Sequence, residues 1–250
     1  MKENEFYEKI GNWDFSKIEY TVERKSDWDL YEEICRYTNE DSICLDLGTG
    51  GGESLIENYP SCKKIIGIDV SKKMIQTANE NLKNSKRKDI EFILMDNTKL
   101  NFEKESFDLV SARHTVINAK DIHKILKKGG KLIVEGVDKK DCIELKDVFA
   151  RGQGYNDEKA ISEIDLEDIK SAGFSKIEIK EIEEFEYYKT KKDLIKLLEK
   201  APILDDFSEE KGTFEKREIE EKLLEKYIGK FKTEKGILLK RVLYAIIAEK

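Results

Sequence analysis

The pattern that most limits the fold of this chain begins at about residue 42, where short apolar runs alternate with stretches of helical period. Ser71–Leu82 illustrates the helical stretches, because its apolar side chains recur every three or four positions and Ser71 is a suitable N-cap. Strands that alternate with such helices form strand–helix–strand units, which build a parallel sheet covered by helices on both faces. The pattern therefore predicts an α/β fold. The apolar runs are Ile43–Leu47, Ile65–Val70, Ile90–Met95, Phe107–Ala112, Leu132–Val137, Ile177–Ile182 and Val242–Ala248.

The composition is that of a folded chain without membrane segments. It has 250 residues, of which 39% are apolar and 40% charged, and a net charge of −7. No apolar run approaches the roughly 20 residues of a membrane-spanning helix, and the N-terminus lacks the apolar core of a secretory signal. We therefore expect a cytoplasmic protein with no membrane partner. The cysteines lack C-x-x-C spacing, which favours buried reduced thiols over disulfides or a metal site; they are Cys35, Cys44, Cys62 and Cys142.

We expect residues 1–250 to form a single domain in which a helical leader, residues 1–40, precedes the first strand of the sheet. Ser26 begins a sequence that resembles a capping box, and apolar residues from Trp28 onward follow at helical spacing. The leader is therefore predicted to pack a helix against the sheet.

A second helical segment interrupts the last two predicted strands. Residues 186–238 are too many for a plain connection between neighbouring strands. One amphipathic helix begins at Thr190 and stops at Pro202, and a second carries Leu223 and Tyr227 on one face. We expect this insertion to form a cap over the mouth of a substrate site, which is the acceptor site discussed below.

A glycine-rich turn between the first strand and the next helix is the strongest candidate for a ligand-binding segment. Cys44–Ser54 reads CLDLGTGGGES, and a glycine-rich first turn in a parallel sheet is the usual position for a nucleotide cofactor. Glu53 occupies the place of the third glycine of a dinucleotide fingerprint, and Asp46 lies two residues before the first glycine. Two carboxylates oppose a pyrophosphate but suit the sulfonium and ammonium of S-adenosylmethionine. No Gly-Lys-Ser/Thr follows, which excludes a P-loop.

The next two strands also end in acids. Asp69 lies at the end of the second strand and is placed to accept hydrogen bonds from both ribose hydroxyls of a nucleoside. Asp96 follows the third strand, where a carboxylate can accept from an adenine amino group. Helix capping is the alternative role for Asp46 and Asp69, although three acids at consecutive strand ends favour a cofactor site.

In these motifs the chain resembles the class I S-adenosylmethionine-dependent methyltransferases, of the methyltransferase type 11 or ubiquinone-biosynthesis-methyltransferase-like kind. CLDLGTGGG, GIDVS, MDNTKL, FDLVSARH and LKKGGKLIVEG occur in the order and at the spacing typical of that family, over roughly residues 40–138. The resemblance implies a Rossmann-like seven-stranded sheet of order 3-2-1-4-5-7-6 whose last strand is antiparallel. It implies S-adenosylmethionine as cofactor, with the methionine part held at the glycine loop, the ribose at the second strand end and the adenine at the third. The cofactor residues it implies are Asp46, Gly48, Thr49, Gly50, Gly52, Asp69, Val70, Met74, Asp96, Asn97 and Arg113.

The fourth strand ends in Ser-Ala-Arg-His, where the acceptor of this family meets the methyl group. His114 is a candidate catalytic base for an acceptor O–H or N–H, or else it only shapes the pocket. Arg113 either neutralises an acidic substrate or pairs with Glu135. The acceptor remains open, because the chain has no Asn-Pro-Pro-Tyr motif, no catalytic cysteine of the cytosine-C5 kind and no Asp/His metal cluster.

These observations lead to a methyltransferase that modifies an O, N or C nucleophile of a small molecule. Acids interleave with the lysine-rich stretches, so nucleic acid is a weaker candidate partner. A ribosomal or transfer RNA base methyltransferase is one alternative, and a catalytically silent S-adenosylmethionine-binding module is another. We expect a monomer or homodimer.

Overall fold

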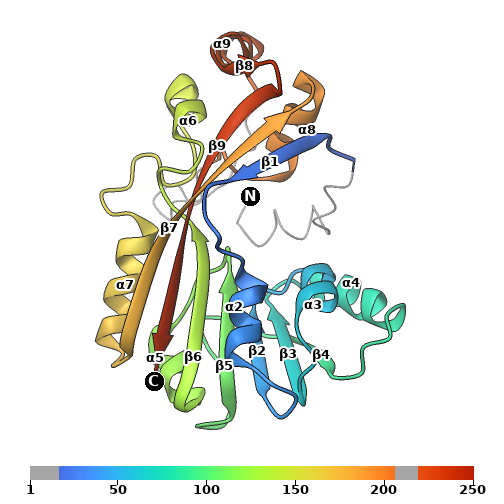
Figure 1. Ribbon diagram of the computed structural model, residues 1–250, viewed down its shortest axis with the longest axis vertical. Helices are drawn as coiled ribbons and strands as arrows, with labels where there is room; N and C mark the ends of the chain where they lie inside the picture. The colour runs from blue at the N-terminus through green and yellow to red at the C-terminus, as the bar shows by residue number, and fades with distance from the viewer. Residues whose placement is uncertain (1–16, 206–218) are drawn as a thin grey trace.

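The computed structural model describes residues 17–205 and 219–250, which form a mixed α/β structure around one nine-stranded sheet (Figure 1). The first 16 residues of the predicted leader, and residues 206–218 of the predicted insertion, lie outside the described part. The strands are β1 (Tyr20–Arg24), β2 (Ile43–Leu47), β3 (Lys64–Asp69), β4 (Ile90–Leu94), β5 (Phe107–Arg113), β6 (Leu126–Val137), β7 (Ser175–Tyr188), β8 (Lys232–Thr233) and β9 (Gly236–Glu249). The helices are α2 (Leu30–Tyr37), α3 (Glu53–Asn58), α4 (Lys72–Lys83), α5 (Ala119–Ile125), α6 (Ile143–Phe149), α7 (Ile161–Ser171), α8 (Lys191–Lys200) and α9 (Glu221–Phe231).

The strand order is β1-β7-β9-β6-β5-β2-β3-β4, with β8 paired to β9. Without β1 and β8, the remaining seven strands read 3-2-1-4-5-7-6 from the β4 edge, and β9 is antiparallel to both of its neighbours. This confirms the α/β class and the order that the family resemblance implied. All seven strands coincide with a predicted apolar run, although β6, β7 and β9 extend well beyond theirs.

The leader differs from the prediction because it contributes a strand as well as a helix. Tyr20–Arg24 forms β1 and pairs with the outer half of β7 in antiparallel register, Tyr20 opposite Tyr188. A strand as long as β7 would otherwise leave its edge unpaired, and such edges are commonly covered. The predicted capping residue of this helix was Ser26, but the N-cap of α2 is Asp29, which accepts from the Tyr31 and Glu32 amides. Ser26 accepts from the Trp28 amide instead.

The predicted insertion contains the two expected helices, but its boundaries shift. Its first and last residues belong to β7 and β9, which run antiparallel as far as the Tyr188–Ile237 pair. The connecting segment is therefore 189–235, with α8 and α9 at its two ends.

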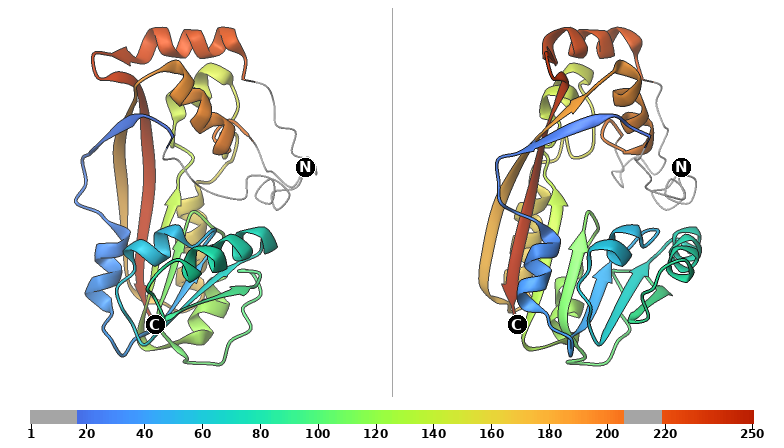
Figure 2. Two further views of the ribbon diagram at one scale, coloured as in Figure 1. Left: turned by 90° about the vertical axis from the view of Figure 1, so that its right-hand side faces the viewer. Right: turned by 45° about the vertical axis from the view of Figure 1, so that its right-hand side comes forward.

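We call the upper part of the molecule the cap: β1, α6, α8, α9 and the outer ends of β7 and β9 (Figure 1). Its apolar side chains form a core of their own, in which Leu194 and Leu197 of α8 lie with Leu224 and Tyr227 of α9. The seven-strand part below has separate cores on the two faces of the sheet, as strands covered by helices on both sides require. Figure 2 shows the cap above the carboxyl ends of β2 and β3. Within 17–205 and 219–250, no helix is long and apolar enough to cross a membrane.

Candidate functional site

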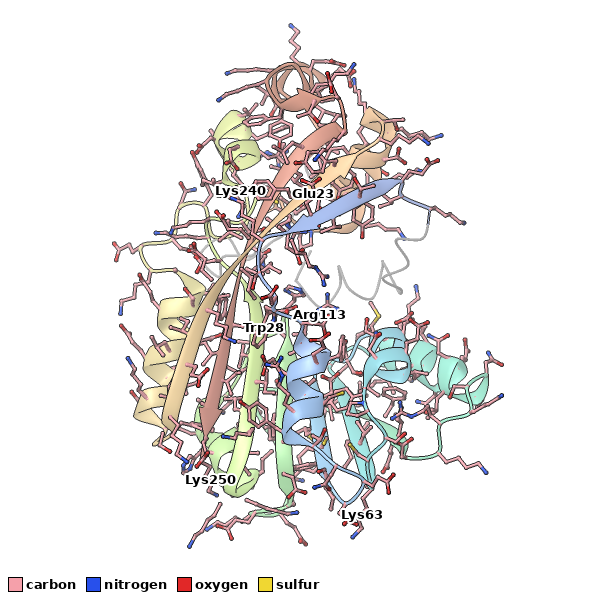
Figure 3. The ribbon with its side chains drawn as sticks, viewed as in Figure 1. Glu23, Trp28, Lys63, Arg113, Lys240 and Lys250 are labelled. Atoms are coloured by element: carbon pink, nitrogen blue, oxygen red, sulfur yellow. The ribbon has the colours of Figure 1, made fainter. Side chains whose placement is uncertain are left out.

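A cavity of about 480 Å³ lies between the cap and the carboxyl ends of β2, β3 and β5. Its floor contains the glycine turn after β2 and Asp69 at the end of β3, and its roof contains residues of β1, β7, β9 and α8. Figure 3 shows Arg113 at the upper end of β5, where the sheet faces the cap. Of the predicted site residues, those that line the cavity are Asp46, Gly48, Thr49, Gly50, Asp69, Val70, Met74, Asn97, Arg113 and His114.

The glycine turn adopts a backbone that L side chains rarely reach. Gly48, Gly50 and Gly52 have φ angles of +68°, +57° and +75°. Gly48 and Gly50 line the cavity, but Gly52 does not, because it is buried where a Cβ atom would lie 2.6 Å from Phe92 Cζ. Gly52 therefore has a packing role at the start of α3.

Asp69 fastens this turn from the neighbouring strand. Its Oδ2 accepts from the Gly50 amide at 3.0 Å and its Oδ1 from the Ser71 amide at 2.8 Å. Ser71 is itself the N-cap of α4, so the alternative of Asp69 as the helix cap is not what the structure shows. Burial raises the pKa of Asp69, and each carboxylate oxygen retains a lone pair for a ligand.

Asp46 lies deeper in the same floor. Its Oδ1 accepts from the Ser111 hydroxyl at 2.7 Å, and that hydroxyl shares a second 2.7 Å contact with the Tyr59 hydroxyl. Burial raises the pKa of Asp46 to about 6, even though Ser111 hydrogen bonding acts in the opposite direction. Capping by Asp46 is not seen either, because the N-cap of α3 is Gly52.

Asp96 and Asn97, which follow β4 and were both predicted to bind the cofactor, lie in different surroundings: only Asn97 lines the cavity. The amide nitrogen of Asn97 donates to Thr115 Oγ1 at 2.7 Å, while Asn97 Oδ1 is buried without a hydrogen-bond partner in the described structure. Asp96 lies outside the cavity lining and accepts from the backbone and hydroxyl of Thr98. An unsatisfied buried carbonyl is costly, so Asn97 Oδ1 in the cavity lining, and not Asp96, is placed to accept a hydrogen bond from a ligand.

At the end of β5, a hydrogen-bonded chain connects the leader to the site. Arg113 Nε donates to Glu135 Oε1 at 3.1 Å, and the indole of Trp28 donates to Glu135 Oε2 at 2.7 Å. Of the two roles considered for Arg113, the structure therefore shows pairing with Glu135. Trp28 lies to the left of Arg113 and slightly lower in Figure 3.

His114 follows with a positive φ of +53°, and its amide donates to the Glu135 carbonyl at 2.8 Å. Burial, reinforced by the charges of Arg113 and Arg241, lowers the pKa of His114 to about 3. The imidazole is therefore neutral near pH 7, with a lone pair for hydrogen bonding but little proton affinity.

We expect Trp28→Phe to lower the free energy of unfolding by about 1.5 kcal/mol, because the buried carboxylate of Glu135 then lacks the hydrogen bond that the indole N–H donates. Urea denaturation measures the change. Tyr37→Phe, an exposed substitution on the adjoining helix, is the control and should change the free energy by less than about 0.5 kcal/mol. Equal stability of the two variants would show that the Trp28 indole contributes nothing through its N–H.

The roof of the cavity contains functional candidates that the sequence motifs did not reveal. Tyr20, Asp141, Glu186, Tyr188 and Arg241 all line it. In the sequence of β7, polar and aromatic residues continue to alternate past Ile182, and that continuation is the one signal that bears on Glu186 and Tyr188. Nothing local indicates that Tyr20 forms a strand or that Asp141 and Arg241 meet.

Comparison with known proteins connects this geometry to a family. The family described as "Methyltransferase domain" matches residues 45–134, which contain the glycine turn and the ends of β2, β3, β4 and β5. Demethylmenaquinone methyltransferase of Lactococcus lactis is 35% identical over 99 residues, 36% of this chain and 39% of that protein. Phosphoethanolamine N-methyltransferase 3 of Arabidopsis thaliana is 28% identical over 180 residues, 66% of this chain and 35% of that protein. The matched region spans less than half the length of these curated relatives.

Solved structures share the fold at low sequence identity. YcgJ of Bacillus subtilis superposes with a TM-score of 0.56 at 14% identity, over 88% of this chain and 97% of that chain. Phosphoethanolamine N-methyltransferase 2 of Haemonchus contortus, in complex with S-adenosylmethionine, superposes with a TM-score of 0.53 at 18% identity, over 99% of this chain and 56% of that chain. The family match over the glycine turn and the strand ends, with the strand order of the sheet, supports a class I S-adenosylmethionine-dependent methyltransferase.

Proposed function

We propose that this protein transfers the methyl group of S-adenosylmethionine to an O, N or C nucleophile of a small molecule. The observation that carries the proposal is the cavity of about 480 Å³, whose floor matches a cofactor and whose roof closes over the space beyond it. That volume falls in the range of small-molecule sites, roughly 300–1,000 Å³.

The floor fits the cofactor on three independent observations. The positive-φ glycines expose backbone to a ligand, the Asp69 carboxylate retains free lone pairs, and the buried Asn97 Oδ1 has no partner in the described structure. We infer that Asp69 binds the ribose and Asn97 the adenine, while Asp46 lies near the positively charged methionine part. S-adenosylmethionine supplies an electrophilic methyl group on its sulfonium when bound.

The residues around the reacting centre contribute alignment and exclusion of water. Neutral His114 lines the cavity and orients an acceptor N–H or O–H through its lone pair. It is a weak base because its pKa is about 3, so we propose an orienting role in place of proton abstraction.

A small acceptor is favoured over RNA or protein because the cap covers the space beyond the cofactor floor. The relatives are mixed, since one matched protein is a demethylmenaquinone methyltransferase and another is a ribosomal protein L11 methyltransferase. A second Haemonchus contortus structure contains phosphomonomethylethanolamine and S-adenosylhomocysteine, at 18% identity and a TM-score of 0.52.

Calorimetric titration and a transfer assay test the proposal together. S-adenosylmethionine and S-adenosylhomocysteine should bind at micromolar levels, and NAD at least about tenfold more weakly, because Asp46 and Glu53 oppose its pyrophosphate. Tritiated S-adenosylmethionine should label the small-molecule fraction of a cell extract. Label in RNA, together with RNA binding that weakens as the salt concentration rises, would favour the RNA alternative. Binding without transfer to any fraction would favour a silent module, and equal binding of NAD would overturn the cofactor assignment.

Cofactor affinity should also depend on pH through Asp46. The raised pKa means that the folded protein retains the Asp46 proton more strongly than the unfolded chain. The stability gained from that proton is present below about pH 3.8 and is lost as the pH rises through about 6. Cofactor binding has the opposite dependence, because its positive groups are attracted by the ionised carboxylate.

Between pH 7.5 and pH 5 we expect affinity for S-adenosylmethionine to fall about tenfold, following the ionised fraction of Asp46. Asp46→Asn should bind more weakly at pH 7.5 and vary less over the same range. Titrations at four pH values measure both proteins. A wild-type affinity that does not change with pH would remove Asp46 from contact with the positive part of the cofactor.

A further inference from the structure

The roof of the cavity presents an aromatic surface that the proposed cofactor site does not use. Tyr20 of β1 and Tyr188 of β7 stack with ring centroids 5.3 Å apart and an interplanar angle of 10°. Tyr188 is buried, whereas Tyr20 remains 41% exposed. The pair therefore offers a ring face or edge to a molecule in the cavity. Electron-rich faces of this kind attract positively charged groups.

A buried charge network lies beside these rings. Arg241 donates through Nε and Nη2 to Asp141, at 2.8 and 3.1 Å, and through Nη1 to Glu186 at 3.2 Å. The Tyr188 hydroxyl donates to the second oxygen of Glu186 at 2.5 Å. Both carboxyl residues are buried, at 3% and 7% exposure, and they share one guanidinium. Buried Lys146 interacts electrostatically with Asp141, so the excess negative charge of the network lies at Glu186, which shares its guanidinium with Asp141.

The rest of the lining adds to this negative charge. Among the described residues that line the cavity, five carboxylates accompany two guanidiniums, and none of the lining residues is a lysine. Both guanidiniums are ion-paired, Arg113 with Glu135 and Arg241 with Asp141 and Glu186. His114 adds no charge near neutral pH. A phosphate or carboxylate in the cavity would therefore meet carboxylates, and both nearby guanidiniums already have anionic partners. Burying an unpaired anion in this way is unfavourable.

We propose that the acceptor half of this cavity selects small molecules that carry a positively charged amine on an apolar body, and that it rejects phosphate- and carboxylate-bearing acceptors. The inference rests on the proposed function, because it names the acceptor class for the same site. The amine lies near Glu186 and over the Tyr20–Tyr188 pair, and the apolar body contacts Ile18, Leu197 and Ile203, which also line the roof.

The test is calorimetric titration of the full chain saturated with S-adenosylhomocysteine, using three probes of similar shape. The probes are 2-phenylethylamine, 2-phenylethanol and 3-phenylpropionate. We expect the amine to bind at least about tenfold more tightly than the carboxylate, with the alcohol between them. Glu186→Gln should weaken amine binding about tenfold and leave alcohol binding nearly unchanged.

The matched control is Glu181→Gln. Glu181 lies on the same strand, its side chain is 61% exposed, and it pairs with Lys140 away from the cavity lining. The Glu181→Gln substitution removes the same charge as Glu186→Gln and should leave the affinities for all three probes unchanged. Because Glu186 also holds Arg241, Tyr20→Leu serves as a second variant at an exposed position. It should weaken amine binding severalfold while alcohol binding is retained.

Several outcomes overturn the inference while S-adenosylhomocysteine still binds: no amine binding, a carboxylate that binds as well as the amine, or amine binding unaffected by both cavity variants. Failure of S-adenosylhomocysteine itself to bind is a different result, because it contradicts the proposed function. Measuring its affinity for every variant therefore separates the two.

Discussion

The Asp69→Ala variant should bind S-adenosylmethionine about 30- to 150-fold more weakly than the wild type, equivalent to roughly 2–3 kcal/mol. Two losses contribute. The ribose hydroxyls lose a charged acceptor, and the Gly50 amide loses the Asp69 oxygen that holds it at 3.0 Å. The effect is expected to be large because, in the proposed cofactor site, one carboxylate contacts the ligand and also fixes the turn beside it.

Titration calorimetry measures this change, and two further variants interpret it. Asp69→Asn keeps one acceptor oxygen and should lose less affinity than Asp69→Ala. Asp41→Ala removes an exposed carboxylate before β2, at the opposite end of that strand from the glycine turn, and should bind as the wild type does. Unchanged binding in Asp69→Ala, with the fold intact by circular dichroism, would remove this residue from the cofactor site.

The second large effect concerns stability. Gly52→Ala should lower the free energy of unfolding by about 3 kcal/mol, because it combines a positive-φ backbone with overpacking. The backbone has φ of +75°, and the new Cβ would lie 2.6 Å from Phe92 Cζ and 3.1 Å from Ala78 Cβ. Phe92 is itself buried, so its ring cannot move into solvent without exposing apolar surface.

Two other glycines separate the causes. Gly129 has φ of +77° with nothing within 4 Å of its Cβ position, so Gly129→Ala should lose only the backbone contribution, about 1 kcal/mol. Gly229 lies in α9 with nothing within 4 Å and without a positive φ, so Gly229→Ala should gain about 0.5 kcal/mol. Urea denaturation gives all three values. If Gly52→Ala were no less stable than Gly129→Ala, the contact with Phe92 would not restrict this position.

The cap gives this methyltransferase fold its particular site. Seven strands and their helices supply the cofactor floor, whereas the roof comes from extensions of β7 and β9 and from β1 at the sheet edge. Residues that we propose for acceptor choice, Tyr20, Glu186 and Arg241, all belong to this second part. Differences in acceptor between related chains are therefore expected to lie in the cap.

The sequence by itself determined the features that depend on local spacing. Alternating apolar periods predicted the α/β class, Ser71 was correctly predicted to cap α4, and the glycine turn and the acids at the strand ends indicated a cofactor edge. These features were accessible because the side-chain periods of helices and strands, and the φ preference of glycine, act within a few residues. The carboxyl ends of parallel strands then meet at one edge whatever lies between them.

Only the tertiary structure decided the contacts between distant segments. Trp28 meets Glu135 across 107 positions, and Arg241 meets Asp141 across 100, with no sequence period that relates them. Tyr20 enters the roof because β1 covers an edge whose length depends on the pairing of β7 with β9. Such partners are selected by packing, by burial of charge and by the need to cover a strand edge. Each of these depends on the surroundings of a residue in the folded chain and not on its neighbours in sequence.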